Sequence, residues 1–269
     1  MAFLLPQAAN IQAFYRMEET SGTRADLSDN ANTLQDNNSV LYGTGHIGNA
    51  ADFELGNDEY LSIADGSQTG LDITGDMTIA CWVKLESTPA TEMGVVTKDK
   101  DSARCYNFAI TAGTTKPRFD IFKAGGNHTL ITANTSLVAG TWYHICGTYN
   151  YIGDGSSELN IYVDGLADAT EKTNAVGPIA DTVAWFGVGA REYSGYPSYF
   201  DGLIDEVIVW NKCLTAAEVL QVKNITKYFA AAGGFSGVSS DCWIFLKDMW
   251  EKHNKIWRPN KKILIPQGI

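Results

Sequence analysis

The chain has 269 residues, of which 45% are hydrophobic and 19% charged, so it is long enough to bury the core of one large domain. Its net charge is −11, and an acidic surface repels phosphate backbones and anionic membranes, which argues against nucleic acid or a membrane as the main partner. Residues 241–269 carry six Lys/Arg against three acidic residues, so the rest of the chain has a net charge of −14. This balance favours calcium or neutral sugars as ligands.

The N-terminal segment Met1-Ala-Phe-Leu-Leu-Pro6 has no basic region and only a short apolar run, so it does not resemble a secretory signal peptide. No stretch approaches the roughly 18 apolar residues of a membrane span. The five cysteines are scattered without CxxC spacing, which is typical of free thiols in a reducing cytoplasm, with one long-range disulfide as the alternative. We therefore expect any role outside a cell to depend on a route other than Sec.

Short segments rich in β-branched and aromatic residues recur up to residue 215, separated by Gly, Asn and Asp. The predicted strands are Ile11–Met17, Tyr60–Ile63, Met77–Leu85, Tyr106–Thr111, Arg118–Lys123, Trp142–Tyr149, Leu159–Val163, Val183–Val188 and Leu203–Trp210. Period-two alternation puts one set of side chains on a common face: Met77, Ile79, Cys81 and Val83. The strand that ends at Val163 runs into Asp164-Gly165, a hairpin-turn dipeptide. Many short strands with such turns predict a sandwich or barrel.

The pattern changes near residue 215. Thr215-Ala-Ala-Glu218 has the form of a helix capping box and predicts a short helix that closes the domain. A second helix is predicted from Asp241, and the apolar stripe on it that should dock onto a partner consists of Trp243, Leu246, Trp250 and Trp257. The predicted organisation is an N-terminal arm over 1–9, a sandwich over 10–222, a Gly/Ser-rich linker over 223–240, and an anchor over 241–269.

An ordered series of segments carries a family resemblance: Ala13–Glu18, Asp26–Asn32, Gly45–Phe53, Asp58–Ile63, Met77–Val83, Gly140–His144, Leu159–Gly165, Gly187–Ala190 and Phe200–Trp210. Over about 10–222 the chain resembles the laminin-G-like, pentraxin-related family of concanavalin A-like jelly rolls. The resemblance implies an all-β fold, a two-sheet antiparallel jelly-roll sandwich, here followed by a short C-terminal helical tail. It also implies binding of glycans or proteins, often with calcium, but it names no ligand.

Calcium needs six to eight oxygen ligands, and Asp26-x-Ser28-x-Asn30-x-Asn32 alternates suitable side chains. Asp205 matches an acidic position near the closing strand of the resembled family. We therefore expect one structural Ca²⁺ held by Asp26, Asn30 and Asp205. The alternative is that the loop side chains cap turns by hydrogen bonding.

The segment Arg191–Phe200 combines Gly and Pro with aromatic residues, and its candidate ligand-binding residues are Arg191, Tyr193, Tyr196 and Tyr199. Sugars stack on aromatic rings in such loops, while protein contact and simple packing over a sheet end are the alternatives. A second segment, Asp99-Lys-Asp101, is flanked by Lys98 and is expected to be a solvated, charge-balanced turn, with a ligand loop as the alternative.

No Glu-x-Asp-x-x-Glu motif of a retaining glucanase is present, and the adjacent Asp205 and Glu206 should face opposite sides of a strand. We therefore expect a non-enzymatic module. The sandwich, the free cysteines and the docking tail favour a virion-associated decoration or adhesion protein of a phage head or tail, joined to other virion proteins in an oligomeric assembly. One alternative is a cellular carbohydrate- or protein-binding module, located at the cell surface, outside the cell by a non-Sec route, or in the cytoplasm. The other alternative is an accessory domain of a glycan hydrolase.

Overall fold

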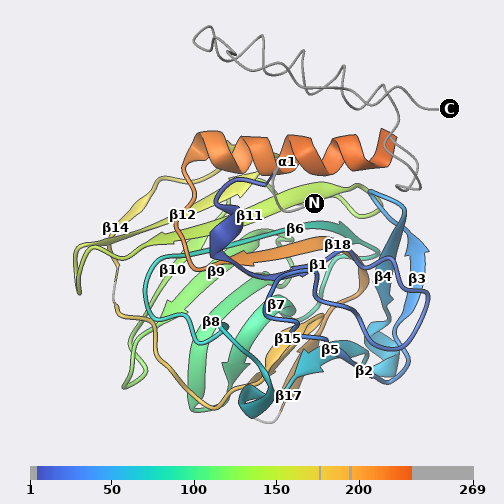
Figure 1. Ribbon diagram of the computed structural model, residues 1–269, viewed down its shortest axis with the longest axis horizontal. Coiled ribbons are helices and arrows are strands. Elements are labelled where there is room, and N and C mark those ends of the chain that lie inside the picture. The colour runs from blue at the N-terminus through green and yellow to red at the C-terminus, as the bar shows by residue number, and fades with distance from the viewer. Residues whose placement is uncertain (1–4, 176, 194–195, 232–269) are drawn as a thin grey trace, which may run out of the picture. The chain divides into compact units, whose positions relative to one another are not determined.

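The computed structural model describes residues 5–175, 177–193 and 196–231. The predicted docking residues Trp243, Leu246, Trp250 and Trp257 lie outside them, as does the linker from residue 232. The described part is a sandwich of two largely antiparallel sheets, which confirms the predicted fold class (Figure 1). Within it, no helix combines the length and the apolar character that crossing a membrane requires.

The first sheet, named sheet I, has the order β13-β12-β11-β6-β18-β4-β3, with β1 beside β18 and β14 beside β12. Its strands are β1 (Ile11–Tyr15), β3 (Leu41–Thr44), β4 (Asn49–Phe53), β6 (Met77–Leu85), β11 (Tyr143–Asn150), β12 (Ser157–Val163), β13 (Leu166–Ala167), β14 (Lys172–Ala175) and β18 (Gly202–Trp210). The first and last strands of the sandwich are therefore paired with each other, which closes the domain on itself.

The second sheet, sheet II, has the order β10-β9-β8-β7-β15-β5-β2, and the β16–β17 hairpin joins it through β7. Its strands are β2 (Gln35–Asn37), β5 (Tyr60–Ile63), β7 (Met93–Lys100), β8 (Ala103–Ile110), β9 (Pro117–Phe122), β10 (His128–Thr132), β15 (Phe186–Val188), β16 (Ala190–Tyr193) and β17 (Tyr196–Tyr199). In the described part of the chain, single turns of 3-10 helix precede β1 or lie between strands: η2 (Ala8–Asn10), η3 (Leu55–Asn57) and η4 (Asp65–Ser67).

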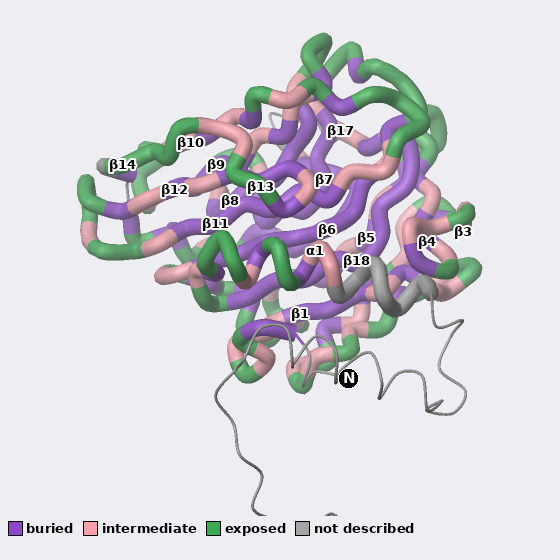
Figure 2. Tube along the Cα trace, turned by 90° about the horizontal axis from the view of Figure 1, so that it is seen from above, coloured by how far each residue is buried: buried purple, intermediate pink, exposed green. Residues whose placement is uncertain are grey.

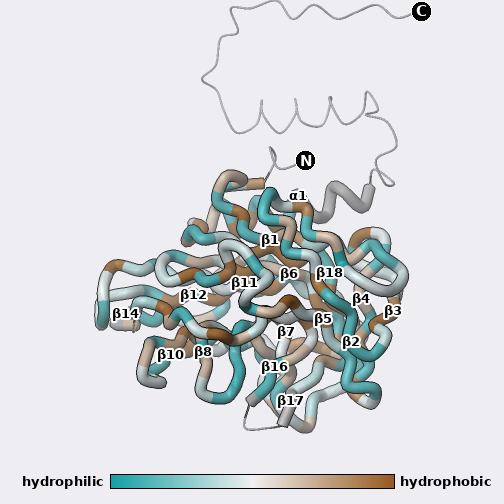
Figure 3. The backbone as a smooth tube through the Cα atoms, turned by 60° about the horizontal axis from the view of Figure 1, so that its bottom comes forward, coloured by the Kyte–Doolittle hydropathy of each residue, from teal (hydrophilic) through white to brown (hydrophobic). Residues whose placement is uncertain are grey.

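The main core fills the space between the sheets, and the buried strands run through the centre while the loops are exposed (Figure 2). The alternation predicted for β6 is confirmed, because the residues of the predicted face all belong to this core: Met77, Ile79, Cys81 and Val83. Hydropathy changes from residue to residue along the strands, as expected where one face of a sheet is buried and the other is less so (Figure 3). The two sheets approach closely where Phe119 of β9 lies over Gly147 of β11, since a Cβ at residue 147 would come within 2.6 Å of the ring.

A second apolar cluster covers the outer face of sheet I, where helix α1 (Ala216–Ala231) lies across the strands (Figure 1). Val219 and Val222 of the helix are buried in this cluster. The predicted capping box is confirmed, because the Glu218 backbone N–H donates to Thr215 Oγ1 and the Thr215 N–H donates to the Glu218 carboxylate. The helix continues to Ala231, so residues 223–231 are helical and the predicted start of the linker at 223 is wrong.

The hairpin between β12 and β13 turns at Asp164-Gly165, and both residues have positive φ, as the predicted turn requires. A side chain at Gly165 would come within 2.9 Å of Leu220 on α1, so the helix also needs this glycine. The four described cysteines are free thiols, as the scattered spacing predicts: Cys81, Cys105, Cys146 and Cys213.

Candidate ligand-binding site

The prediction of a solvated turn over residues 99–101 is wrong for Asp99 and for the flanking Lys98. Strand β7 extends to Lys100, and both Lys98 and Asp99 are buried in it. Lys98 lies on the core side beneath two loops, while Asp99 accepts hydrogen bonds from Arg104 on β8. Sequence alone suggests a turn because charged residues are rarely buried unless they are paired, and the partners here lie on distant loops for Lys98 and on the neighbouring strand for Asp99.

The outer face of sheet II carries a connected ion-pair network. Arg191 on β16 is buried between Glu92 and Asp99, with its Nε 2.7 Å from the Asp99 carboxylate. Arg118 bridges Glu92 at 2.6 Å and Asp120 at 2.9 Å. The candidate residue Arg191 therefore attaches the β16–β17 hairpin to Asp99 on β7 and to Glu92 just before that strand, instead of presenting its donors to solvent.

Beside this network, three half-buried aromatic rings form what we call the aromatic cluster: Tyr60, Trp185 and Tyr199. The Tyr60 ring centroid lies 5.4 Å from that of Trp185 and 6.0 Å from that of Tyr199. Trp185 Nε1 donates to the Glu192 carboxylate at 3.3 Å, and Glu192 pairs with Lys100 at 3.2 Å. The cluster thus combines ring surface with a fixed carboxylate and an ammonium.

The fold brings together residues from β5, the segment before β15, and β17, which are far apart in the sequence. Sequence reasoning identified Tyr199 and missed Tyr60 and Trp185. Tyr60 could have been found from alternation, because Leu61 and Ile63 point into the core and leave it on the outer face. The backbones of Tyr193 and Tyr196 pair with each other in the β16–β17 hairpin, and their side chains lie outside the described part.

The surroundings of the aromatic cluster are acidic. Burial, followed by the charge of Asp58 and the nearby Tyr60 and Glu192, raises the pKa of Tyr199. A negative field of this kind disfavours a second anion at the same place.

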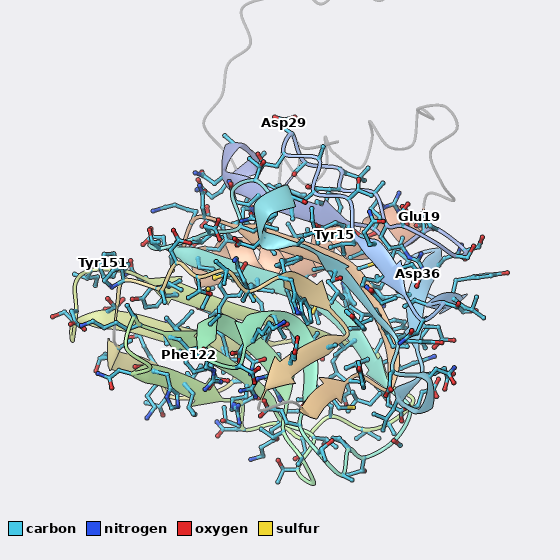
Figure 4. All side chains as sticks on the ribbon, turned by 90° about the horizontal axis from the view of Figure 1, so that it is seen from below. Tyr15, Glu19, Asp29, Asp36, Phe122 and Tyr151 are labelled. Carbon is cyan, nitrogen blue, oxygen red and sulfur yellow. The ribbon has the colours of Figure 1, made fainter. Side chains whose placement is uncertain are left out.

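The predicted calcium loop is ordered by hydrogen bonds. Asp26 Oδ1 accepts from the backbone N–H groups of Phe14 and Ser28, and its Oδ2 accepts from Ser28 Oγ and the Asn32 N–H. Asn30 Nδ2 donates to the carbonyl of Gln12 on β1. These contacts match the turn-capping alternative, and Asp29 lies at the outer end of the loop (Figure 4).

The third predicted ligand, Asp205, belongs to a different part of the structure: its Oδ2 accepts from the backbone N–H of Ile47, in the turn between β3 and β4, at 2.9 Å. No contact in the described residues joins it to Asp26 or Asn30. The calcium site stays a prediction.

Strand β18 contains a β-bulge at Asp205 and Glu206, and the expectation that the two residues face opposite sides of the sheet is wrong. Ile204 and Val207, on either side of the pair, both belong to the core. The pairing with β6 shifts register between Asp205 and Ile208, and Glu206 has a φ of 50°. The bulge interrupts regular alternation and leaves both carboxylates outside the core cluster.

These two carboxyl groups are buried and electrostatically perturbed. Burial, with a smaller contribution from Glu206, raises the pKa of Asp205 to about 8. Burial also raises the pKa of Glu206 to about 7, although Arg16 Nε lies 3.1 Å from its carboxylate and opposes the rise. With 0% and 1% of their surfaces exposed, the two side chains are out of reach of a sugar.

A second group of rings lies on the outer face of sheet I. His46 stacks on Trp82 with centroids 3.5 Å apart, and Trp142 lies edge-on to His46 at 6.1 Å. The Lys84 ammonium lies 5.6 Å from the Trp142 centroid. Because these faces already have protein partners, this group offers less ring surface to a ligand than the aromatic cluster.

Sequence reasoning also missed a group of carboxylates, Asp52, Glu54 and Glu86, whose oxygen atoms lie within 4.8 Å of one another. They come from the ends of β4 and β6, so no local motif reveals them. Burial, followed by repulsion from neighbouring carboxylates, raises the pKa of all three. Glu54 and Glu86 are exposed, so this group of carboxylates is accessible from solvent.

Several solved structures share this fold. Domain 4 of AbnA, an extracellular GH43 arabinanase from Geobacillus stearothermophilus solved with arabinotriose, aligns over 80% of this chain and 98% of its own, with 20% identity and a TM-score of 0.56. A sialidase from Trypanosoma rangeli, solved with sialic acid, aligns over 84% of this chain and 34% of its own (14% identity, TM-score 0.61). The binding domain of botulinum neurotoxin DC, solved with SialylT, aligns over 81% and 52% (11% identity, TM-score 0.62).

At these identities the structural likeness establishes the fold and not a shared ligand. No curated protein sequence matches the chain. The sequence model of one family matches residues 55–220, which is more than half of the chain and includes most strands of both sheets. The chain belongs to the concanavalin A-like lectin/glucanases superfamily.

Proposed function

We propose that this chain is a non-enzymatic glycan-binding module and that it binds sugars on the aromatic cluster. The observation that carries the proposal is the convergence of Tyr60, Trp185 and Tyr199, three half-buried rings held beside a fixed carboxylate. Partly exposed rings flanked by a few oriented polar groups suit the C–H faces and hydroxyls of a sugar. The domain of AbnA solved with arabinotriose supports the class of ligand.

The acidic surroundings refine the ligand class. The negative charges of Asp58 and Glu192 both act on Tyr199. Lys100, the basic group that contacts Glu192, is already paired with this carboxylate. These charges favour neutral sugars over sialylated or uronic acid sugars.

The test begins with a glycan array of the wild-type chain, followed by titration calorimetry with the best neutral oligosaccharide. Trp185→Ala and Tyr199→Ala should each weaken binding about tenfold or more, because aromatic anchors carry much of the affinity at such sites. Tyr42→Ala is the matched control, since Tyr42 is exposed on the edge strand β3 of the other sheet. Unchanged affinity in folded Trp185→Ala and Tyr199→Ala proteins, or a wild type that binds no glycan, would contradict the proposal.

We further propose that the protein is a decoration or adhesion protein of a virion. In this proposal the C-terminal tail attaches it to other virion proteins, and the sandwich binds a structural calcium ion. The support for this proposal is the predicted Trp stripe at 243–257 together with a glycan-type sandwich. Deleting residues 241–269 should then release the sandwich from its particle or oligomer while glycan binding persists. An accessory domain of a glycan hydrolase is the second candidate, favoured by the alignment with nearly the whole of AbnA domain 4.

For the enzymatic alternative, Glu54 and Glu86 are a candidate pair, because both are exposed and their carboxylate oxygens lie within 4.8 Å of each other. Retaining and inverting glycosidases both need two carboxyl groups facing one bond. Sugar hydrolysis by the wild type that disappears in Glu54→Gln and Glu86→Gln would establish an enzyme and overturn the non-enzymatic proposal.

A further inference from the structure

A buried ammonium group joins two loops of sheet II. Lys98 on β7 is fully buried, and its Nζ lies 2.6 Å from Asp65 Oδ1 and 2.9 Å from Asp72 Oδ1. The same nitrogen donates to the backbone carbonyls of Thr182 at 2.9 Å and Ala184 at 2.7 Å. Two carboxylates and two carbonyls from the segments 65–72 and 182–184 thus surround a single cation.

This set of oxygens is the set that a hard metal ion uses. Calcium binds carboxylate and backbone carbonyl oxygens in flexible geometry, whereas magnesium demands a tighter octahedron. Lysine supplies one positive charge against two carboxylates, and the ammonium provides three donors for four acceptors. Burial lowers the pKa of Lys98, but its hydrogen bonds to Asp65 and Asp72 and the nearby charges of Cys105 and Asp72 together outweigh burial and raise it, so the ammonium stays charged.

We propose that the Lys98 ammonium occupies a cation site and replaces a bound metal ion there. By binding oxygens of both loops, it holds residues 182–184 against residues 65–72. A chain without this side chain binds Ca²⁺ at the same oxygens. In the wild type the junction is ordered without added metal, because the cation is part of the polypeptide.

The site also positions a ring of the aromatic cluster. Ala184, whose carbonyl accepts from Lys98, directly precedes Trp185, and its own N–H contacts Thr182 Oγ1 at 3.4 Å. Lys98 is therefore a positioning residue for the Trp185 ring, and this part of the proposal rests on the proposed glycan function.

The experiment compares the full-length wild type with Lys98→Ala, Lys98→Met and Lys100→Ala by thermal melting and by calorimetric titration with CaCl2 and MgCl2. Lys98→Ala should melt about 5–15 °C below the wild type in a chelator, the loss expected for a buried charge pair broken on one side. Millimolar calcium should restore at least half of that loss, with magnesium much less effective. Lys98→Met fills the site with an apolar chain and should melt low without a calcium response.

Lys100→Ala is the matched control for melting and metal titration only, because Lys100 is also on β7 but its side chain is 44% exposed and pairs with Glu192 beside the aromatic cluster. Calcium would also raise the melting temperature of the wild type if the loop at Asp26 binds it. The quantity that tests the proposal is therefore the calcium-induced rise in melting temperature of Lys98→Ala minus that of the wild type. An equal response in the wild type, Lys98→Ala and Lys98→Met overturns the proposal, as does a Lys98→Ala chain that fails to fold with or without calcium.

Glycan affinity provides an independent readout. It should fall in Lys98→Ala and return with calcium, while the wild type stays indifferent to the metal. If the wild type binds no glycan, the proposed function is wrong. The melting and metal-titration experiments then still test the cation site.

Discussion

Replacing Asp205 by Asn should stabilise the protein at alkaline pH. Asp205 is fully buried, its Oδ2 accepts one backbone N–H from Ile47, and the nearby Glu206 and Glu18 are acidic. Its pKa of about 8 in the folded protein compares with 3.8 for the free group. An asparagine has nearly the same shape, keeps an acceptor for Ile47 and never ionises.

The sign and size follow from proton linkage. Above about pH 4 the unfolded chain loses the Asp205 proton while the folded chain keeps it, so stability is full below this pH and is lost as the pH rises to about 8. One pKa unit is about 1.4 kcal/mol, so the rise from 3.8 to about 8 sets an upper bound of about 6 kcal/mol. Because Glu206 shares this environment and pairs with Arg16, we expect a gain of about 2–4 kcal/mol for Asp205→Asn, or about 5–15 °C in melting temperature.

The assay is thermal or urea unfolding of the wild type and Asp205→Asn from about pH 4 to about pH 9. The two curves should converge at the acidic end and separate as the pH rises. Glu206→Gln is the comparison variant, and its gain should be smaller because it also loses the ion pair with Arg16. A difference that is constant across the range, or an Asp205→Asn protein that is less stable at high pH, would refute the reasoning.

Three further predictions concern packing, the helix and ligand charge. Gly147→Ala should destabilise the sandwich by about 1–3 kcal/mol, measured by urea unfolding, because the new methyl group would meet the Phe119 ring of the opposite sheet; unchanged stability would mean that the sheets separate easily. Thr215→Ala should lower stability by about 1 kcal/mol through loss of the capping box, with the effect visible in the same assay and absent for the exposed Thr141→Ala. Glu192→Gln keeps an acceptor for Trp185 but removes a charge, so it should raise binding of an acidic oligosaccharide severalfold relative to its neutral counterpart in calorimetry; equal ratios in the two proteins would show that charge does not select the ligand.

Local sequence was sufficient for the elements whose signal lies within a few residues. The alternation of β6, the turn at Asp164-Gly165 and the capping box at Thr215 are each set by side-chain periodicity or by a backbone conformation that a short motif specifies. The ordered series of family segments extended these signals to the two-sheet sandwich. Strand β7 escaped this reasoning because its charged end, Lys98 and Asp99, is buried by partners more than 25 positions away or on a neighbouring strand.

For the candidate site, the sequence indicated which residues could bind a ligand, but it indicated little about which residues contact them in space. It singled out Tyr199 and Arg191, but only the tertiary structure put Tyr199 beside Tyr60 and Trp185 and enclosed Arg191 between two carboxylates. The bulge that puts Asp205 and Glu206 outside the core arises from the register between β18 and β6, to which no local pattern is sensitive. The alternation of apolar and polar residues is a property of a single strand, so the sequence alone could predict the strands and the sandwich. Side-chain clusters and β-bulges depend on how strands that are distant along the chain pair with each other, so only the folded structure reveals them.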